Sequence, residues 1–130
     1  MLQIDDVLLP AKGNRLAAAH VTAELAGYVA SSGFFILRPD QQLIVPIFLM
    51  AYLNHPYGQR SLREHLKAST TVPVLNKSDI LMTTILLPSM VEQHRLAELH
   101  QLFQREKQLT EELLQLKEKM YQQAFQIGLQ

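Results

Sequence analysis

The stretch that decides the fold is SMVEQHRLAELHQLFQREKQLTEELLQLKEKMYQQAFQIG, residues 89–128. It contains no proline, and its only glycine is the last residue. Ser89 followed by Glu92 is the capping-box pattern with which many helices begin. Leucine, glutamate, glutamine and lysine, which are good helix formers, dominate the rest. The stretch therefore predicts one helix from Met90 to about Phe125, on the order of 50 Å long.

Apolar side chains recur along this helix with the seven-residue spacing of a coiled coil. With Leu99 at heptad position a, every a and d position from there to the end of the helix is apolar except Glu106 and Gln123. A second apolar stripe widens the face beyond a two-stranded seam. Because a small domain cannot bury so long a face, we expect the helix to meet another helix. The predicted pairing residues are Leu96, Leu99, Leu102, Phe103, Leu109, Leu113, Leu116 and Met120.

The residues upstream of this helix predict a small mixed unit that begins with strands. Residues 7–9 form an apolar run closed by Pro10, and residues 33–38 are rich in aromatic and β-branched side chains, so both predict strands. Residues 17–21 fit a strand or a short helix equally well. The predicted fold class is α+β, with a small mixed domain over residues 1–88 and a long pairing helix over residues 89–127.

Helices are expected between these strands and the long helix. Residues 45–53 predict a buried helix with proline in its first turn, and residues 59–67 predict a second, short helix after Gly58. Residues 69–87 predict a strand, a turn and a second strand that stops at Pro88. Asn76 followed by Asp79 is an N-cap pattern inside that segment.

Composition limits what kind of protein this is. A chain of 130 residues with no cysteine has room for one domain plus an appended element, and it cannot hold a disulfide or a thiolate zinc site. The first residues lack the basic and apolar regions of a signal peptide, and the apolar run over residues 43–53 is shorter than the roughly 20 residues of a membrane span. We therefore expect a cytoplasmic protein.

The charge balance argues against a protein that grips DNA by itself. Twelve Lys and Arg residues balance twelve Asp and Glu residues, and the balance holds on either side of Pro88. Phosphate contacts supply most non-specific affinity for DNA, so a DNA-binding protein normally carries a positive surplus. A role on nucleic acid therefore needs a local basic patch or a partner that supplies the charge.

Catalytic motifs are weak. Residues 54–57, Asn-His-Pro-Tyr, resemble the Asn-Pro-Pro-Tyr/Phe motif of amino-methyltransferases, but the second residue is His and no glycine-rich cofactor loop accompanies it. No lysine has an acidic residue two positions upstream, as restriction-type nucleases need. On the long helix, His100 lies well round from His94 and Glu98, so a metal site is not expected. We expect no catalytic residues, no metal, no cofactor and no enzyme activity.

Polar and basic residues on two turns and one short helix are the candidates for nucleic-acid contact, because these residue types bond phosphates and base edges. For each one alone, a solvated surface position is the more common role. The DNA-binding candidates are Lys12, Asn14, Arg15, Arg60, Arg63, Lys67, Ser69, Thr70, Thr71 and Lys77.

One arrangement of motifs resembles a known family. Residues 69–80, the Ile-Leu-Leu-Pro run at 85–88, Glu92-Gln93 and the long helix are together similar to the end of a target recognition domain in the specificity (S) subunit of type I restriction–modification enzymes. Upstream, residues 6–13 are similar to the strand and turn of the same family. Asp5 and Ala68 stand where the family has glycine.

This resemblance implies DNA sequence readout by the globular part and docking of methyltransferase (modification) subunits on the helices. It implies that catalysis belongs to those subunits. Complete S subunits carry two recognition domains and two antiparallel spacer helices, whereas the match here begins in the middle of one domain. One helix then implies a homodimer or pairing with another specificity half.

Two functions stay open at this point. The first is a half-size or truncated specificity subunit that recognises DNA and acts as a scaffold. The second is a non-catalytic interaction or dimerisation module, or a regulator, that lacks DNA readout. No membrane partner is expected.

Overall fold

The computed structural model describes residues 1–64, 66 and 72–130, and these form two compact units. The globular unit is Met1–Ala97, and the helical unit is Glu98–Gln130. Helix α4 (Met90–Gly128) supplies the last residues of the globular unit and nearly all of the helical unit. The predicted α+β class and the long C-terminal helix are confirmed. The division lies inside α4 and not at Pro88, because Gln93 and Ala97 are buried with the globular unit.

The globular unit is built on a three-stranded antiparallel sheet. Strand β1 (Val7–Pro10) is central, between β2 (Ala19–His20) and β3 (Phe34–Leu37). The two predicted strands are therefore confirmed, and the ambiguous segment becomes β2. The pairing of β2 with β1 ends at Leu8 of β1, so Pro10 pairs only with β3. Proline, which has no N–H to donate, is tolerated there because one of its two sides has no neighbouring strand.

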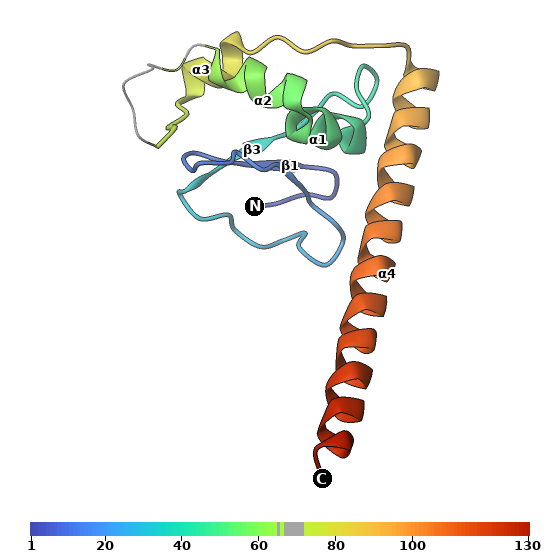
Figure 1. Ribbon diagram of the computed structural model, residues 1–130. Coiled ribbons are helices and arrows are strands. Elements are labelled where there is room, and N and C mark those ends of the chain that lie inside the picture. The colour runs from blue at the N-terminus through green and yellow to red at the C-terminus, as the bar shows by residue number, and fades with distance from the viewer. Residues whose placement is uncertain (65, 67–71) are drawn as a thin grey trace. The chain divides into compact units, whose positions relative to one another are not determined.

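Helices α1 (Pro46–Asn54) and α2 (Pro56–Arg63) lie over one face of this sheet (Figure 1). Burial alternates along β1, so Val7 and Leu9 are fully buried while the residues between and after them are only partly covered. Each fully buried aliphatic side chain contributes about 1.5–3 kcal/mol. The core that joins sheet and helices consists of Val7, Leu9, Leu16, Ala18, Ile44, Phe48, Leu49, Leu53, Leu62 and Leu75.

Helix α2 begins earlier than predicted. The expected range was residues 59–67 with Gly58 as the break before it, but Gly58 lies inside the helix and is buried. A Cβ atom at this position would lie 1.9 Å from the carbonyl oxygen of Tyr52 in α1. Glycine therefore permits the close approach of two consecutive helices and does not end one, which corrects the prediction.

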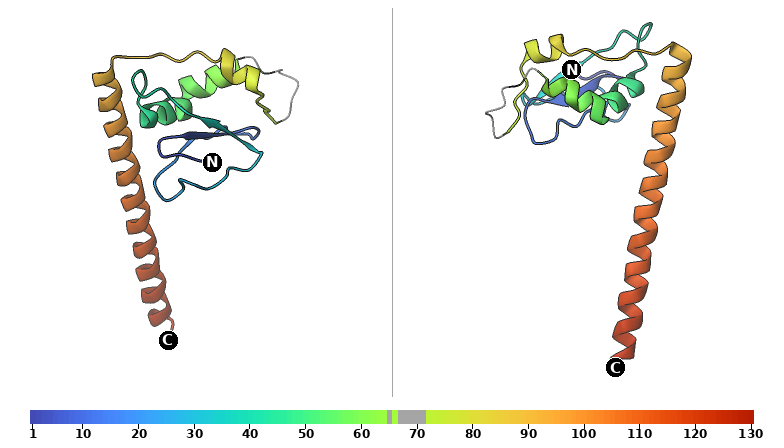
Figure 2. Two further views of the ribbon diagram at one scale, coloured as in Figure 1. Left: turned by 180° about the vertical axis from the view of Figure 1, so that it is seen from behind. Right: turned by 45° about the horizontal axis from the view of Figure 1, so that its top comes forward.

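The prediction of strand, turn and strand over residues 69–87 is wrong in its second half. Helix α3 (Lys77–Met82) occupies the middle, and the Asn76–Asp79 capping box is formed in full. The following residues are extended but pair with no strand of the described part of the chain; the Leu86 N–H donates to the Tyr52 hydroxyl at 3.2 Å. Figure 2 shows this connection running without regular structure from α3 to α4. Residues 69–71 lie outside the described residues.

Asp5 has a backbone conformation that glycine normally takes. Its φ of +72° lies in the left-handed region, where Asp and Asn are the least disfavoured of the other residues. Its carboxylate bonds the Nε2 atom of His20 at 2.8 Å, and its N–H donates to the Val21 carbonyl. Asp5 therefore takes a backbone conformation in which glycine is usual, and its side chain gains a contact to β2.

The side-chain amide of Gln93 joins the start of α4 to two other segments. Gln93 is only 1% exposed. Its Nε2 donates to the carbonyls of Pro88 and Leu43 at 2.9 and 3.2 Å, and its Oε1 accepts the Val45 N–H at 2.8 Å. The Gln93 amide thus makes three hydrogen bonds at the place where α1 and α4 begin.

The capping box predicted at Ser89 forms by half. The Ser89 hydroxyl accepts the Glu92 N–H at 3.3 Å. The Glu92 carboxylate pairs instead with Arg95 at 2.6 Å, one turn along the exposed face. The ion pair of Glu92 with Arg95 therefore takes the place of the contact that a full capping box makes between the Glu92 carboxylate and the Ser89 N–H.

An ion pair between the buried Asp6 and the half-exposed Arg38 joins the N-terminal residues to the sheet. The Asp6 side chain is 1% exposed and accepts from Nε and Nη2 of Arg38 at 2.8 and 2.9 Å and from the Gln3 N–H at 2.8 Å. The hydrogen bond from Arg38 lowers the pKa of Asp6, although burial works in the opposite direction. The charged carboxylate is therefore the form that stabilises the fold.

Replacing Asp6→Asn should lower the free energy of unfolding by about 2–3 kcal/mol at neutral pH, because Arg38 then lacks its anionic partner. The pKa is lowered in the folded state, so the contribution is complete above the unfolded value of about 4 and is lost as pH falls through the folded value. Urea unfolding as a function of pH measures both effects, with exposed Glu24→Gln as the control. Equal stability of Asp6→Asn and the native chain at pH 7 would contradict this prediction.

Replacing Gln93→Ala should cost about 3 kcal/mol or more, because two carbonyls and one N–H lose their partner at a buried site. Urea unfolding again provides the measurement. Gln101→Ala, an exposed glutamine on the same helix, is the matched control and should change little. If both variants unfold alike, the Gln93 bonds do not hold the helix start in place.

Candidate nucleic-acid interface and helix-pairing surface

Two side-chain amides at the junction of α1 and α2 fix the segment that precedes β2. The Asn54 side chain accepts the Ala18 N–H at 2.7 Å and donates to the Ala18 carbonyl at 2.9 Å, as a neighbouring strand would. Gln59 Nε2 donates to the carbonyls of Leu16 and Leu53 at 2.8 and 2.7 Å. The Asn54 amide therefore binds the backbone of Ala18. This is a structural role for the first residue of the segment 54–57, which resembled a methyltransferase motif.

The turn over residues 12–15 is held from two sides. On one side, the Leu75 N–H donates to Ala11 at 2.6 Å, the Gly13 N–H donates to Pro73 at 3.1 Å, and Lys12 and Val74 form a β-bridge. On the other side, Arg63 Nη2 donates to the Asn14 carbonyl. Arg63 thus joins the turn to α2.

These contacts bring predicted DNA-binding residues from two separate segments together. We call the set Lys12, Asn14, Arg15, Arg60 and Arg63 the turn–helix cluster. All five side chains are exposed, and within residues 1–64, 66 and 72–130 none of its cations forms an ion pair with a carboxylate. Exposed, unneutralised guanidinium and ammonium groups are suited to phosphate contact.

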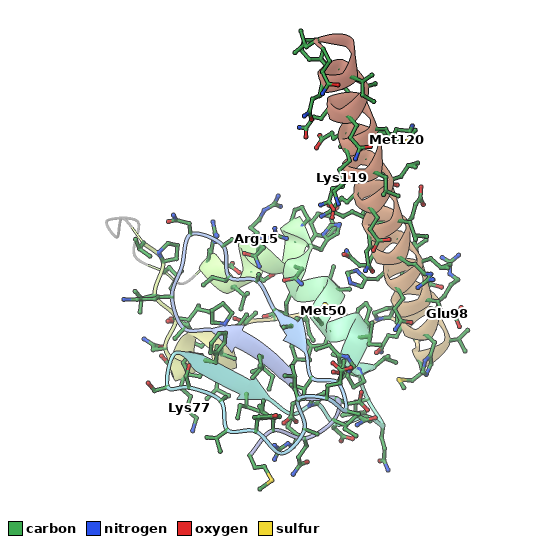
Figure 3. All side chains as sticks on the ribbon, turned by 90° about the horizontal axis from the view of Figure 1, so that it is seen from below. Arg15, Met50, Lys77, Glu98, Lys119 and Met120 are labelled. Carbon is green, nitrogen blue, oxygen red and sulfur yellow. The ribbon has the colours of Figure 1, made fainter. Side chains whose placement is uncertain are left out.

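The remaining candidates do not join this cluster. Lys77 is exposed at the start of α3, and Figure 3 shows it well apart from Arg15. Lys67, Ser69, Thr70 and Thr71 lie outside the described residues. The DNA-binding assignment of every candidate remains a prediction.

Two aromatic residues beside the cluster were missed by the sequence reasoning. Tyr57 is 56% exposed, the His55 ring lies edge-on to the Tyr57 ring at 4.8 Å, and the Arg60 guanidinium lies 5.9 Å from the centroid of that ring. His55 Nδ1 also accepts the Tyr57 N–H and so caps α2. The spacing of three residues from Tyr57 to Arg60 was the available signal, since such residues share a helix face once the helix is known to start at Pro56.

The helical unit presents its predicted pairing residues to solvent. Leu99, Leu102, Phe103, Leu109, Leu113, Leu116 and Met120 are each between 52% and 68% exposed. A lone helix cannot cover its own apolar stripe, so this face is uncovered within the helical unit, residues 98–130. Leu96 differs from the others, because it lies in the globular unit and packs partly buried against its core.

Two further findings concern metal ligation and membrane spanning among the described residues. No group of three or more His, Asp or Glu side chains is placed there to ligate a metal ion. None of the described helices has the combination of length and apolar character that crossing a membrane requires.

Two solved structures share this architecture over most of the chain. One belongs to a study of complex assembly and conformational transition of the type I R-M system, with a TM-score of 0.69. The other is the HsdS subunit from Thermoanaerobacter tengcongensis, with a TM-score of 0.65. Each is 23% identical and matches 83% of this chain. The chain has the fold of HsdS, the specificity subunit of type I R-M systems.

The similarity to HsdS is partial in length. The chain corresponds to 28% of each solved HsdS-like chain, so it spans less than a third of either. No protein-family model matches the sequence, and no functionally curated protein matches it. The HsdS likeness therefore establishes the fold, and the resemblance inferred from the motifs agrees with it.

Proposed function

We propose that this chain is a specificity-subunit component of a type I restriction–modification system. Its globular unit takes part in recognition of a DNA sequence, and its helix serves as a scaffold on which methyltransferase subunits dock. The chain itself performs no catalysis, because that chemistry belongs to the docked subunits. The observation that carries the proposal is the likeness to the HsdS fold, which covers 83% of this chain.

The turn–helix cluster supports the DNA-recognition part of the proposal. It combines Lys12, Arg15 and Arg60, which have no carboxylate partner among the described residues, with Arg63, whose guanidinium is anchored on the Asn14 carbonyl. Anchoring reduces the freedom that a long side chain loses on binding. The zero net charge of the chain is compatible with this role when partner subunits supply the remaining contacts to phosphate.

The exposed face of α4 supports the scaffold part. An exposed apolar stripe, interrupted at Glu106, is formed by Leu99, Leu102, Leu109, Leu113 and Leu116. Stripes of this length are typical of helices that pair with other helices. The proposed partners are a second copy of this chain or another specificity half, and the methyltransferase subunit.

Substituting Arg15→Gln and Arg60→Gln together should weaken binding of the complex with a type I methyltransferase subunit to duplex DNA. The slope of log affinity against log salt should fall by about 1–2, since each lost phosphate contact removes about 0.9. Fluorescence anisotropy over a salt series measures the slope. Lys107→Gln on α4 removes the same kind of charge far along the sequence and serves as the control. An unchanged slope would show that the cluster does not contact phosphate.

The zero net charge favours a second candidate function, an interaction or dimerisation module, or a regulator, without DNA readout. The same complex distinguishes the two. If the chain adds sequence preference beyond that of the methyltransferase subunit alone, the recognition role is supported. If the complex forms but adds no preference, the interaction module is the correct function.

Replacing Leu113→Glu should dissociate the paired helices, because it puts a charge in the middle of the apolar stripe at the cost of a buried leucine contact of about 2 kcal/mol or more per copy. Sedimentation equilibrium of the purified chain measures the change. Gln115→Glu, two residues away and outside the stripe, carries the same charge and should sediment like the native chain. Identical sedimentation of the Leu113→Glu and native chains would mean that the stripe does not pair.

A further inference from the structure

Helix α2 packs one side against the globular unit and presents the other side to solvent. On the inner side, Gly58 lies against α1 and Leu62 belongs to the core. On the outer side, Tyr57, Arg60 and Arg63 are exposed. The helix is thus fixed through its inner side, while its outer side carries an aromatic ring and two cations.

The Tyr57 ring contacts two other side chains. The His55 ring lies edge-on to it at 4.8 Å, and His55 Nδ1 accepts the Tyr57 N–H at 3.1 Å. The Arg60 guanidinium lies over the ring, 5.9 Å from its centroid. A cation over an aromatic face is attracted to it. The ring therefore restricts the orientation of an arginine that would otherwise move freely on the surface.

The edge of the Arg60 guanidinium is available to a ligand. No carboxylate in the part of the chain that the structure describes forms an ion pair with it, and this includes Glu64, one turn further along the chain. Arginine can stack its flat face on a ring and still direct the N–H groups of its edge outward. In that state the planar fork matches two adjacent acceptors at once, which a lysine ammonium cannot do.

Arg63 has a different task from Arg60. Its Nη2 donates to the Asn14 carbonyl, which joins α2 to the turn over residues 12–15. That turn carries Lys12 and Arg15, both exposed. The outer side of α2 is therefore flanked by cations from another segment. Contacts to phosphate position a protein on DNA, whereas contacts to base edges determine which sequence it prefers.

We propose that the outer side of α2 enters the major groove of DNA and that Arg60, positioned by Tyr57, recognises a guanine. This inference rests on the proposed function and adds the reading element and one base that it reads. The major groove is about 12 Å wide and admits one α-helix. Guanine presents O6 and N7 there as adjacent acceptors, and an arginine fork bonds both. Lys12 and Arg15 contact phosphates beside the groove.

Charge and shape both favour this occupant. The first turn of α2 has no acidic residue and its last turn has two arginines, so this side matches the charge of DNA. A phosphate accepts hydrogen bonds from many directions and is bound equally well by a mobile lysine or arginine. A base edge accepts them only in its own plane. The contact with Tyr57 is therefore useful for reading a base, because it restricts the direction of the Arg60 N–H groups.

Selection of sites from a randomised duplex library by the complex with the methyltransferase subunit tests the base contact. Arg60→Lys should lower the preference for guanine at one position about tenfold, because lysine keeps the charge and lacks the planar fork. The salt dependence of affinity should stay the same, because the number of cations is unchanged. Arg105→Lys on α4 is the matched control and should change neither quantity.

Base analogues test the groove. In 7-deazaguanine the N7 acceptor of the major groove is missing, so the native complex should bind a duplex with this analogue at the selected position about fivefold more weakly. The Arg60→Lys complex should bind both duplexes alike. Inosine lacks only the amino group of the minor groove, and the native complex should accept it. Weaker binding with inosine but not with 7-deazaguanine would place the contact in the minor groove and overturn the proposal.

Substitutions of Tyr57 test its role as a positioning residue. Tyr57→Leu should lower the guanine preference about threefold, because an exposed contact between a cation and a ring is worth a factor of that size. Tyr57→Phe keeps the ring and should keep the preference. Equal weakening of all DNA sequences by Tyr57→Leu would mean that the ring only supports the fold, and the positioning role would be wrong.

The outcomes separate this inference from the proposed function. If Arg60→Lys keeps the full guanine preference, α2 does not read that base, while the preference of the native complex still supports the recognition role. If the native complex shows no preference beyond that of the methyltransferase subunit alone, the recognition role fails, and the reading of guanine by α2 fails with it.

Discussion

The arrangement of the globular unit depends on the buried amide of Gln93. One side chain supplies hydrogen bonds to Leu43, Val45 and Pro88, which are backbone groups at the ends of segments far apart in sequence. The first N–H groups of a helix have no hydrogen-bond partner within the helix, and α1 has no side-chain cap. The amide therefore defines where α1 and α4 begin, and so where the connection from α3 must end.

The same device recurs next to the turn–helix cluster. The Asn54 and Gln59 side chains form hydrogen bonds with the backbone of residues 16–18. Arg63 donates to the Asn14 carbonyl in the turn over residues 12–15. Polar side chains here replace strands that the small sheet lacks, and they hold a loop that carries exposed cations. A recognition surface needs such a support, because a loop without fixed backbone partners loses more entropy on binding.

The helical unit is governed by a different constraint. Its stripe of leucines has nothing to pack against in one chain, so the favourable burial of that surface is available only through association.

Local sequence determined the elements that depend on neighbouring residues alone. The long helix, its heptads, the proline-led α1, the N-cap of α3 and the strands β1 and β3 follow from caps, periodicity and turn residues within a few positions. Only the tertiary structure decided that Gly58 lies inside a helix against Tyr52, that residues 83–88 pair with no strand in the part of the chain that the structure describes, and that Arg63 reaches the turn at Asn14. Those features arise from contacts between segments distant in the chain, and propensity and spacing carry no information about which segments meet.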